Sequence, residues 1–256
     1  MRRVLVIGIG AGDPAHVTMQ AVAALNAADV FFVMDKGAAK RELVRLRREI
    51  CERYIEDTSY RIVEVRDPER DRSAPDYAAA VAAWRSARAE VWEELIAREL
   101  GEDCCGAFLV WGDPALYDST IAVLGEIAAR GQVAFEVEVI PGISSVQALT
   151  AAHRVPLNRV GEPIEITTGR RLLEKAGGDA SGDVVVMLDA GTAFDAIEDR
   201  DTEIYWGAYV GTKHEILVSG KLRDVAAEIV RLRAEARERH GWIMDAYLLR
   251  RPARRD

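Results

Sequence analysis

Residues 4–14 read Val-Leu-Val-Ile-Gly-Ile-Gly-Ala-Gly-Asp-Pro, a continuous apolar run that ends in a glycine-rich turn. A short, continuously apolar run is typical of a parallel strand that is buried on both faces. The glycines allow close approach of the backbone to a neighbour or a ligand, and Asp13-Pro14 is a usual helix start, with an N-cap followed by proline. This stretch therefore predicts the strand, loop and helix that open an α/β sheet.

The same alternation continues through the first half of the chain. Longer amphipathic stretches predict helices at Ala15–Ala28, Ala38–Tyr54, Asp76–Leu100 and Thr120–Arg130. Short apolar runs predict buried strands at Val4–Ile7, Val30–Met34, Ile62–Val65, Phe108–Trp111 and Val137–Ile140. The pattern predicts the α/β fold class, with a parallel sheet covered by helices on both faces.

After Pro156 the pattern changes and predicts a second α/β domain with a mixed sheet. The expected elements are one helix at Asp224–Arg239 and strands at Glu165–Thr168, Val184–Leu188, Ile204–Val210, Glu215–Ser219 and Trp242–Leu249. The connection at Gly211-Thr212-Lys213 is too short for a parallel crossover, so it predicts an antiparallel hairpin. We expect an N-terminal domain over residues 1–157 and a C-terminal domain over residues 158–256.

The composition favours a cytoplasmic enzyme that acts on a small molecule. A net charge of −8 argues against general nucleic-acid binding, and the longest apolar runs are too short to cross a membrane. The cysteines Cys51, Cys104 and Cys105 have neither the even count of a disulfide framework nor the paired spacing of a zinc site. We therefore expect reduced thiols and no metal.

The first glycine loop permits one functional hypothesis, a nicotinamide-dependent oxidoreductase. Asp35 ends the second expected strand about where a ribose-binding acid would lie. Two features count against it. The spacing is G-x-G-x-G rather than G-x-G-x-x-G, and Asp13 places a carboxylate where a pyrophosphate would have to lie.

Two more loops follow expected strands. One is Val110-Trp111-Gly112-Asp113-Pro114-Ala115-Leu116-Tyr117, and the other is Val139-Ile140-Pro141-Gly142-Ile143-Ser144-Ser145. Open α/β sheets bind their ligands at the carboxyl ends of the strands. The three loops together predict a shared ligand-binding edge.

With Val186-Met187-Leu188 and Val210-Gly211-Thr212, these loops resemble the tetrapyrrole (corrin and porphyrin) methylase family over nearly the whole chain. The resemblance implies two α/β domains with the active site in the cleft between them, S-adenosylmethionine as methyl donor, and a homodimer. The chain departs from the family at two positions, where Ala11 replaces a usual proline and Trp111 a common glycine. The implied donor-binding residues are Ala11, Trp111, Gly112, Asp113, Leu116, Ser144, Ser145, Met187 and Gly211.

The segment Lys36–Gly106 and residues Thr167–Arg171 resemble the precorrin-6A synthase branch of this family. That branch implies a methyltransferase of cobalamin biosynthesis that methylates carbon 1 of precorrin-5 with loss of acetate. The substrate is rich in carboxylates, and the expected partners are Arg170, Arg171, Lys213 and His214. A sister precorrin methyltransferase that acts at another ring position is the alternative, because the donor-binding loops do not encode the position.

Loss of acetate requires a base that activates water. Asp13 and His16, one turn apart at the start of the first expected helix, are the candidates. His153 and His214 are rivals for this role. A module that senses S-adenosylmethionine or a corrinoid without turnover is the non-enzymatic alternative.

Overall fold

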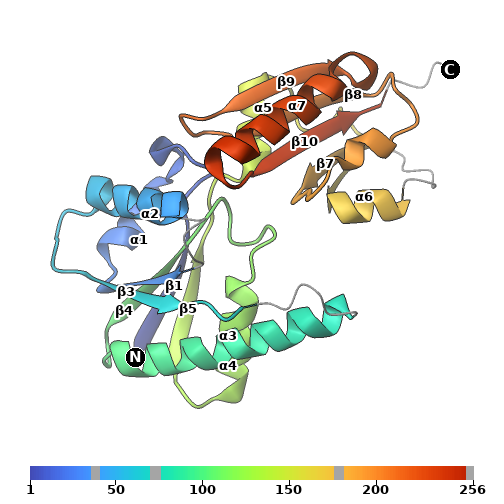
Figure 1. Cartoon of the computed structure of the whole chain (residues 1–256). Coiled ribbons are helices and arrows are strands. Elements are labelled where there is room, and N and C mark those ends of the chain that lie inside the picture. Colours follow the sequence, from blue (N-terminus) through green and yellow to red (C-terminus); the bar gives the residue numbers. More distant parts are fainter. Residues whose placement is uncertain (36–40, 70–75, 176–181, 252–256) are drawn as a thin grey trace. The chain divides into compact units, whose positions relative to one another are not determined.

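The computed structural model describes residues 1–35, 41–69, 76–175 and 182–251 (Figure 1). The chain divides into two compact units, Met1–Ser144 and Ser145–Asp256. Each unit is built on a sheet of five strands in the described residues. No helix in the described part of the chain combines the length and the apolar character that a bilayer span requires.

The sheet of the first unit is parallel throughout, with strand order β3-β2-β4-β1-β5. Its strands are β1 (Arg2–Gly8), β2 (Val30–Asp35), β3 (Arg61–Arg66), β4 (Cys105–Val110) and β5 (Phe135–Ile140). In register, Gly8 of β1 lies beside Val110 of β4, and Ile7 lies beside Ile140 of β5. Because all three strands run in one direction, the loops that follow them leave from the same edge of the sheet.

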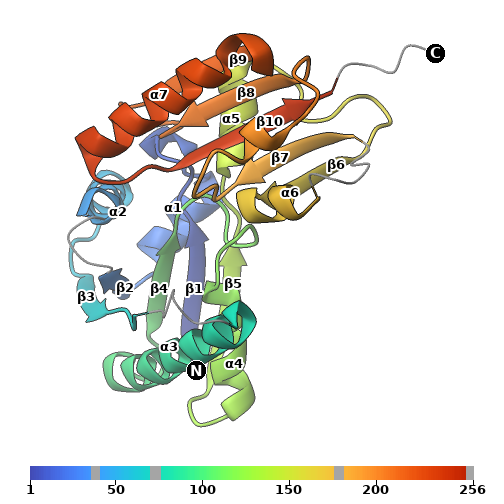
Figure 2. The ribbon, with the colours of Figure 1, turned by 45° about the vertical axis from the view of Figure 1, so that its right-hand side comes forward.

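Helices cover both faces of this sheet. Helices α1 (Met19–Asn26) and α2 (Arg41–Tyr54) pack on the face of Leu5 and Ile7. Helices α3 (Tyr77–Glu99) and α4 (Thr120–Arg130) pack on the face of Val4 and Val6, and Figure 2 shows the two helix layers on opposite sides. The alternation of these buried side chains explains why Val4–Ile7 of β1 is apolar without a break.

Arg88 of α3 is a buried charge inside the apolar layer. Its Nε donates to Oδ1 of Asp67 at 2.7 Å, and both residues are buried. The guanidinium carbon lies 4.6 Å from the ring centroid of Trp84 and 4.5 Å from that of Trp92. A second N–H donates to Oγ of Ser119, the residue before α4, at 2.6 Å. The cation is therefore stabilised by a carboxylate, a hydroxyl and two indole rings.

The sheet of the second unit is mixed, with strand order β6-β7-β10-β8-β9. Strand β6 is parallel to β7, and the other neighbouring pairs are antiparallel. The strands are β6 (Ile164–Thr168), β7 (Asp183–Met187), β8 (Glu203–Ala208), β9 (Ile216–Lys221) and β10 (Asp245–Arg250).

One face of the second sheet carries the main core of the unit. Trp206 and Tyr247 pack there with α6 (Gly169–Lys175), the short 3-10 helix η3 (Ala193–Ala196) and α7 (Leu222–His240). Helix α5 (Ser145–His153) packs on the opposite face, where a Cβ at Gly207 would lie 2.7 Å from Cδ1 of Leu149.

The structure confirms the expected α/β class, the parallel first sheet, the mixed second sheet and the antiparallel hairpin of β8 and β9. The first expected helix is wrong in its start. A 3-10 turn, η1 (Pro14–His16), comes first, and Thr18 then caps α1 by accepting from the amide of Ala21 at 3.1 Å. Residues 38–40 of the second expected helix lie outside the described residues.

Two helices of the second unit were not expected from the sequence. Helix α6 includes Arg170 and Arg171, for which the sequence predicted no helix. Helix α5 contacts β8 and β10 of the second sheet. The compact units therefore divide after Ser144, whereas the sequence analysis places the boundary after Leu157.

Replacing Arg88 tests the buried charge. Arg88→Ala is expected to lower the free energy of unfolding by about 3–5 kcal/mol, because it would break a buried ion pair. The matched control is Arg85→Ala on the same helix, whose side chain is 43% exposed and lies 3.7 Å from Glu126. That change should cost below about 1 kcal/mol. Urea unfolding measures both values, and equal losses would contradict the role of Arg88.

Candidate functional site

Three loops of the first unit meet main chain against main chain. They follow β4, β1 and β5, which are neighbours in the sheet. A Cβ at Gly8 would lie 2.6 Å from the amide nitrogen of Gly142, and a Cβ at Gly142 would lie 2.2 Å from the carbonyl oxygen of Gly112. Such distances leave no room for any side chain, so glycine is required at these positions.

A backbone bridge joins the first two loops. The amide of Gly112 donates to the carbonyl of Gly10 at 2.8 Å, and the amide of Gly10 donates to the carbonyl of Gly112 at 3.3 Å. Both residues have left-handed backbones, with φ of +83° at Gly10 and +70° at Gly112. We call Gly8, Gly10, Gly112 and Gly142 the glycine edge.

Asp113 connects the second loop to the third. Its Oδ1 accepts from the amide of Ala115 within its own turn at 2.9 Å. Its Oδ2 accepts from the amide of Gly142 at 2.9 Å. The turn is closed further by the amide of Leu116, which donates to the carbonyl of Asp113 at 3.3 Å. Ser144, at the end of the third loop, is buried, and Ser145 is the first residue of α5.

Asp13 and His16 lie beside the glycine edge, on the 3-10 turn rather than on an α-helix. The exposed Asp13 accepts from the amide of Ala15 at 2.8 Å, as the sequence predicts for an N-cap. A Cβ at Gly10 would lie 2.5 Å from Cβ of His16, so the histidine packs directly against the glycine edge.

Two buried side-chain nitrogens of the first unit have no hydrogen-bond partner among the described residues. They are Nδ1 of His16 and Nε1 of Trp111. Buried polar atoms in folded proteins are nearly always paired, so each of these nitrogens is available to a water, an ion or a ligand. Both residues belong to the loops of the glycine edge, and Ala11 lies buried between Gly10 and Gly12 in the first of these loops.

In the second unit, several candidate residues share one edge of the sheet. Met187 ends β7 beside Thr168, the last residue of β6, and Arg170 follows in α6. Gly211 follows β8, whose end lies at the same edge, because Ala246 of β10 pairs with Met187 on one side and with Gly207 on the other.

The loop after Met187 is held by Asp189, which the sequence analysis did not single out. The buried carboxylate accepts from the amides of Gly191 at 3.0 Å and Ala193 at 2.8 Å. It also accepts from the hydroxyl of Tyr247 at 2.8 Å, and Arg233 donates to its carbonyl. Burial, followed by the charge of Asp189, raises the pKa of Tyr247 and keeps it protonated. The signal in the sequence is a lone acid directly after a buried strand.

A second part of this network lies at Asp245. Its Oδ2 accepts from Nε of Arg233 at 2.9 Å and from Nε1 of Trp206 at 3.0 Å. Burial raises the pKa of Asp245, while Arg233 acts in the opposite direction. One buried arginine therefore connects β10 to the loop that follows β7.

The residues that the sequence predicts as partners of the substrate carboxylates differ in their surroundings. Arg170 and Arg171 lie 3.8 Å and 2.7 Å from the carboxylate of Glu174 on the same helix. Lys213 is exposed in the turn between β8 and β9, where the amide of Gly211 donates to Glu215 at 2.8 Å. The ring of His214 lies 4.5 Å from that of His240.

His153 has a structural contact. Its Nε2 lies 3.0 Å from the carbonyl oxygen of Trp206, so this nitrogen carries the proton that it donates. The contact fixes helix α5 to strand β8.

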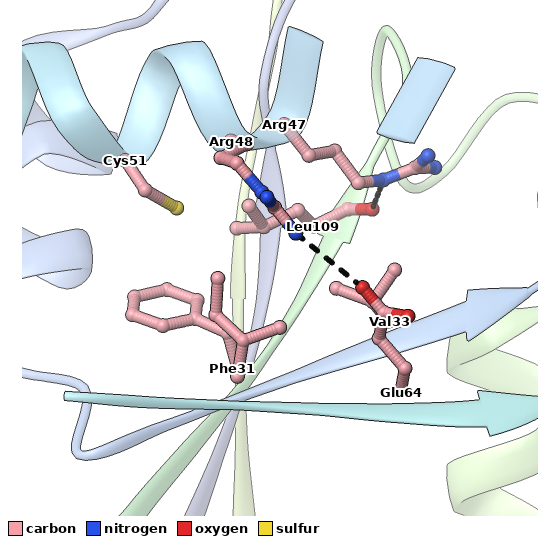
Figure 3. Close-up of a pocket in the computed structure, with 8 residues that line it drawn as sticks. Phe31, Val33, Arg47, Arg48, Cys51, Glu64 and Leu109 are labelled. Atoms are coloured by element: carbon pink, nitrogen blue, oxygen red, sulfur yellow. Dashed lines mark hydrogen bonds and ion pairs between the residues drawn. The ribbon is translucent and has the colours of Figure 1, made fainter. Parts of the chain in front are cut away.

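A small, partly open hollow lies between α2 and the sheet of the first unit (Figure 3). Nε of Arg47 donates to the carbonyl of Leu109 at 3.0 Å, and Arg48 pairs with Glu64 at 3.6 Å. Burial lowers the pKa of Arg47 and raises that of Cys51 to about 11. Cys51 therefore stays a thiol at neutral pH.

Comparison with known proteins places this geometry in a family. The family described as Tetrapyrrole (Corrin/Porphyrin) Methylases matches residues 3–226. The chain belongs to the tetrapyrrole methylase family. It is 53% identical over 253 residues to a precorrin-6A synthase (deacetylating) of Sinorhizobium sp., covering 99% of this chain and 97% of that relative.

Solved structures agree with this assignment. A Corynebacterium diphtheriae protein described as cobalamin-synthesis related has a TM-score of 0.82 and 38% identity, and the match covers 98% of both chains. A uroporphyrin-III C-methyltransferase of Thermus thermophilus, solved with S-adenosylhomocysteine, has a TM-score of 0.60. At 19% identity, over 97% of this chain and 92% of that chain, the second likeness shows the fold alone.

The strand order of this tetrapyrrole methylase does not fit the nicotinamide hypothesis. In the dinucleotide-binding fold the second strand lies beside the first, so its terminal acid reaches the ligand on the first glycine loop. Here β2 pairs with β3 and β4, and β4 separates Asp35 from the loop after β1.

Replacing Gly142 tests the glycine edge of the methylase. Gly142→Ala is expected to lower the free energy of unfolding by about 1–3 kcal/mol, because two segments of main chain must move apart. Gly125→Ala is the control, since a Cβ there meets nothing within 4 Å. In helix α4 this alanine should leave stability unchanged or raise it by up to about 1 kcal/mol. Chemical denaturation gives both values, and an unaffected Gly142→Ala would contradict the described contact.

Proposed function

We propose that this tetrapyrrole methylase transfers a methyl group from S-adenosylmethionine to carbon 1 of precorrin-5 and releases acetate, which gives precorrin-6A. The observation that carries the proposal is the 53% identity to a precorrin-6A synthase (deacetylating) over 99% of the chain. On the family resemblance alone, we also propose that the protein is a homodimer and is located in the cytoplasm.

The glycine edge suits a donor that is held largely by backbone. Close approach of main chain to main chain leaves a surface without side chains, and peptide groups can bind a ligand there. The donor, when bound, supplies an electrophilic methyl group. Ala11, Trp111, Gly112, Asp113, Leu116 and Ser144 in the first unit, with Ser145, Met187 and Gly211 in the second, are the proposed donor-binding residues.

Methyl transfer to an electron-rich ring carbon depends mainly on alignment of the reacting atoms. Loss of acetate is a separate task, in which water adds to the acetyl carbonyl and the bond from that carbon to the ring breaks. The bonding electrons pass to ring carbon 1, which then attacks the methyl group. A base must take the proton of the water.

Asp13 and His16 are the two proposed candidates for this base. Support comes from the unpartnered Nδ1 of His16 and from the exposure of Asp13, both beside the glycine edge. For the substrate carboxylates we propose Arg170, Arg171, Lys213 and His214. Of these, Lys213 is the best-supported partner, because the carboxylate of Glu174 already lies near both Arg170 and Arg171.

The products test the reaction. With precorrin-5 and S-adenosylmethionine, we expect acetate and S-adenosylhomocysteine in equal amounts, because one ring carbon loses the acetyl group and gains the methyl group. Mass spectrometry of the corrinoid and an enzymatic acetate assay measure both. A methylated product that retains its acetyl group would instead indicate a sister precorrin methyltransferase, and binding without turnover would indicate a sensor.

The base is tested by Asp13→Asn and His16→Ala. Each should slow acetate release by roughly 10² to 10⁴ while leaving S-adenosylhomocysteine binding unchanged, because only proton transfer is lost. Asp57→Asn is the matched control, since Asp57 also accepts from the amide two residues later, at 2.9 Å from Ser59, but precedes β3 instead of following a strand. Normal acetate release in both site variants would remove Asp13 and His16 from the mechanism.

A further inference from the structure

The chain contains the tetrapeptide Gly-Asp-Pro-Ala twice, at residues 12–15 and at residues 112–115. Locally the two copies behave alike, because each aspartate accepts from the amide of the alanine two residues later, at 2.8 Å for Asp13 and 2.9 Å for Asp113. They differ in exposure and in the second carboxylate oxygen. Asp13 is exposed, whereas Asp113 is half-buried and its Oδ2 accepts from the amide of Gly142 at 2.9 Å.

The second bond spans 29 residues and joins two loops of the glycine edge. The two loops also approach at Gly142, where a Cβ would lie 2.2 Å from the carbonyl oxygen of Gly112. Two peptide groups so close, with no side chain between them, have few contacts that could keep them in register. A carboxylate that accepts from both loops supplies such a contact, and a bond to a charged acceptor is stronger than one between neutral groups.

We infer that Asp113 is a positioning residue, whose carboxylate fixes the second loop to the third and so shapes the surface against which the donor binds. The inference rests on the proposed donor site and specifies how that site is built. The rival role is electrostatic, in which the negative charge of Asp113 attracts the positive sulfonium of the donor. Both oxygens of Asp113 are already engaged by amides, and this favours the positioning role.

The charge of the ligand separates the two roles. S-adenosylmethionine carries a positive sulfur, and S-adenosylhomocysteine is neutral at that atom but otherwise has the same groups. In Asp113→Ala both acceptor oxygens are removed, so the link between the loops is lost. Positioning then predicts that both affinities fall by the same factor, about tenfold to a hundredfold. An electrostatic role predicts that the affinity for the sulfonium falls much more than the affinity for the neutral product.

Isothermal titration calorimetry of both ligands on one preparation of each variant gives the ratio of the two affinities, which does not depend on the folded fraction. Asp57→Ala is the matched control, because it removes the same kind of local bond, from the amide of Ser59 to Asp57, without a bond to another loop. It should change neither affinity by more than about twofold. A ratio that changes tenfold or more in Asp113→Ala would overturn the inference.

Amide hydrogen exchange of the ligand-free proteins tests the link without the donor. The amide of Gly142 should exchange at least about tenfold faster in Asp113→Ala than in the wild type, and at the wild-type rate in Asp57→Ala. Unchanged exchange in Asp113→Ala would overturn the positioning role even if ligand binding were weakened. A wild-type protein that binds neither ligand would overturn the proposed donor site, and the exchange experiment would still decide whether Asp113 holds the loops.

Discussion

Main chain packed directly on main chain is the constraint on which the first unit depends. Gly8, Gly112 and Gly142 come from three neighbouring parallel strands, and each occupies the space that a Cβ of another would need. The contact exists only because β1 lies between β4 and β5, so that all three chains turn at the same edge. Strand order, loop composition and the placement of His16 and Trp111 are therefore parts of one arrangement.

In the second unit, buried charged side chains as well as glycine hold the loop after β7 in place. The loop after β7 turns at Leu188, which has a left-handed backbone with φ of +53°, and the loop is then held by Asp189. Arg233 reaches this loop from α7 and also binds Asp245 on β10. A buried polar network of this kind stabilises one loop conformation because every member has partners. Gly169 packs closely against this network, since a Cβ there would lie 2.3 Å from Oδ1 of Asp189.

Local sequence patterns predicted the elements that burial dictates. The apolar runs gave β1, β2 and β7 to within two residues at each end, and the glycine loops were placed correctly at the ends of the strands. The contacts that build the site were not predictable in this way. The bond from Asp113 to Gly142 joins residues far apart in sequence, and Arg88 and Arg233 lie in segments whose composition indicates exposed helix surface. Their burial depends on partners from other elements, which no window of a single helix contains.

The pairing of Arg88 with Asp67 has a consequence for the evolutionary history of this fold. Replacing either residue alone breaks a buried ion pair, and the resulting protein is expected to be far less stable than one with the charged pair or with two apolar residues of similar size. The two positions are therefore strongly epistatic, and a lineage can exchange them only together or after other stabilising changes. Trp84 and Trp92 are coupled to the same pair, because both rings pack against the guanidinium of Arg88. The four residues are therefore expected to covary, so variation at any of them should be accompanied by variation at the others.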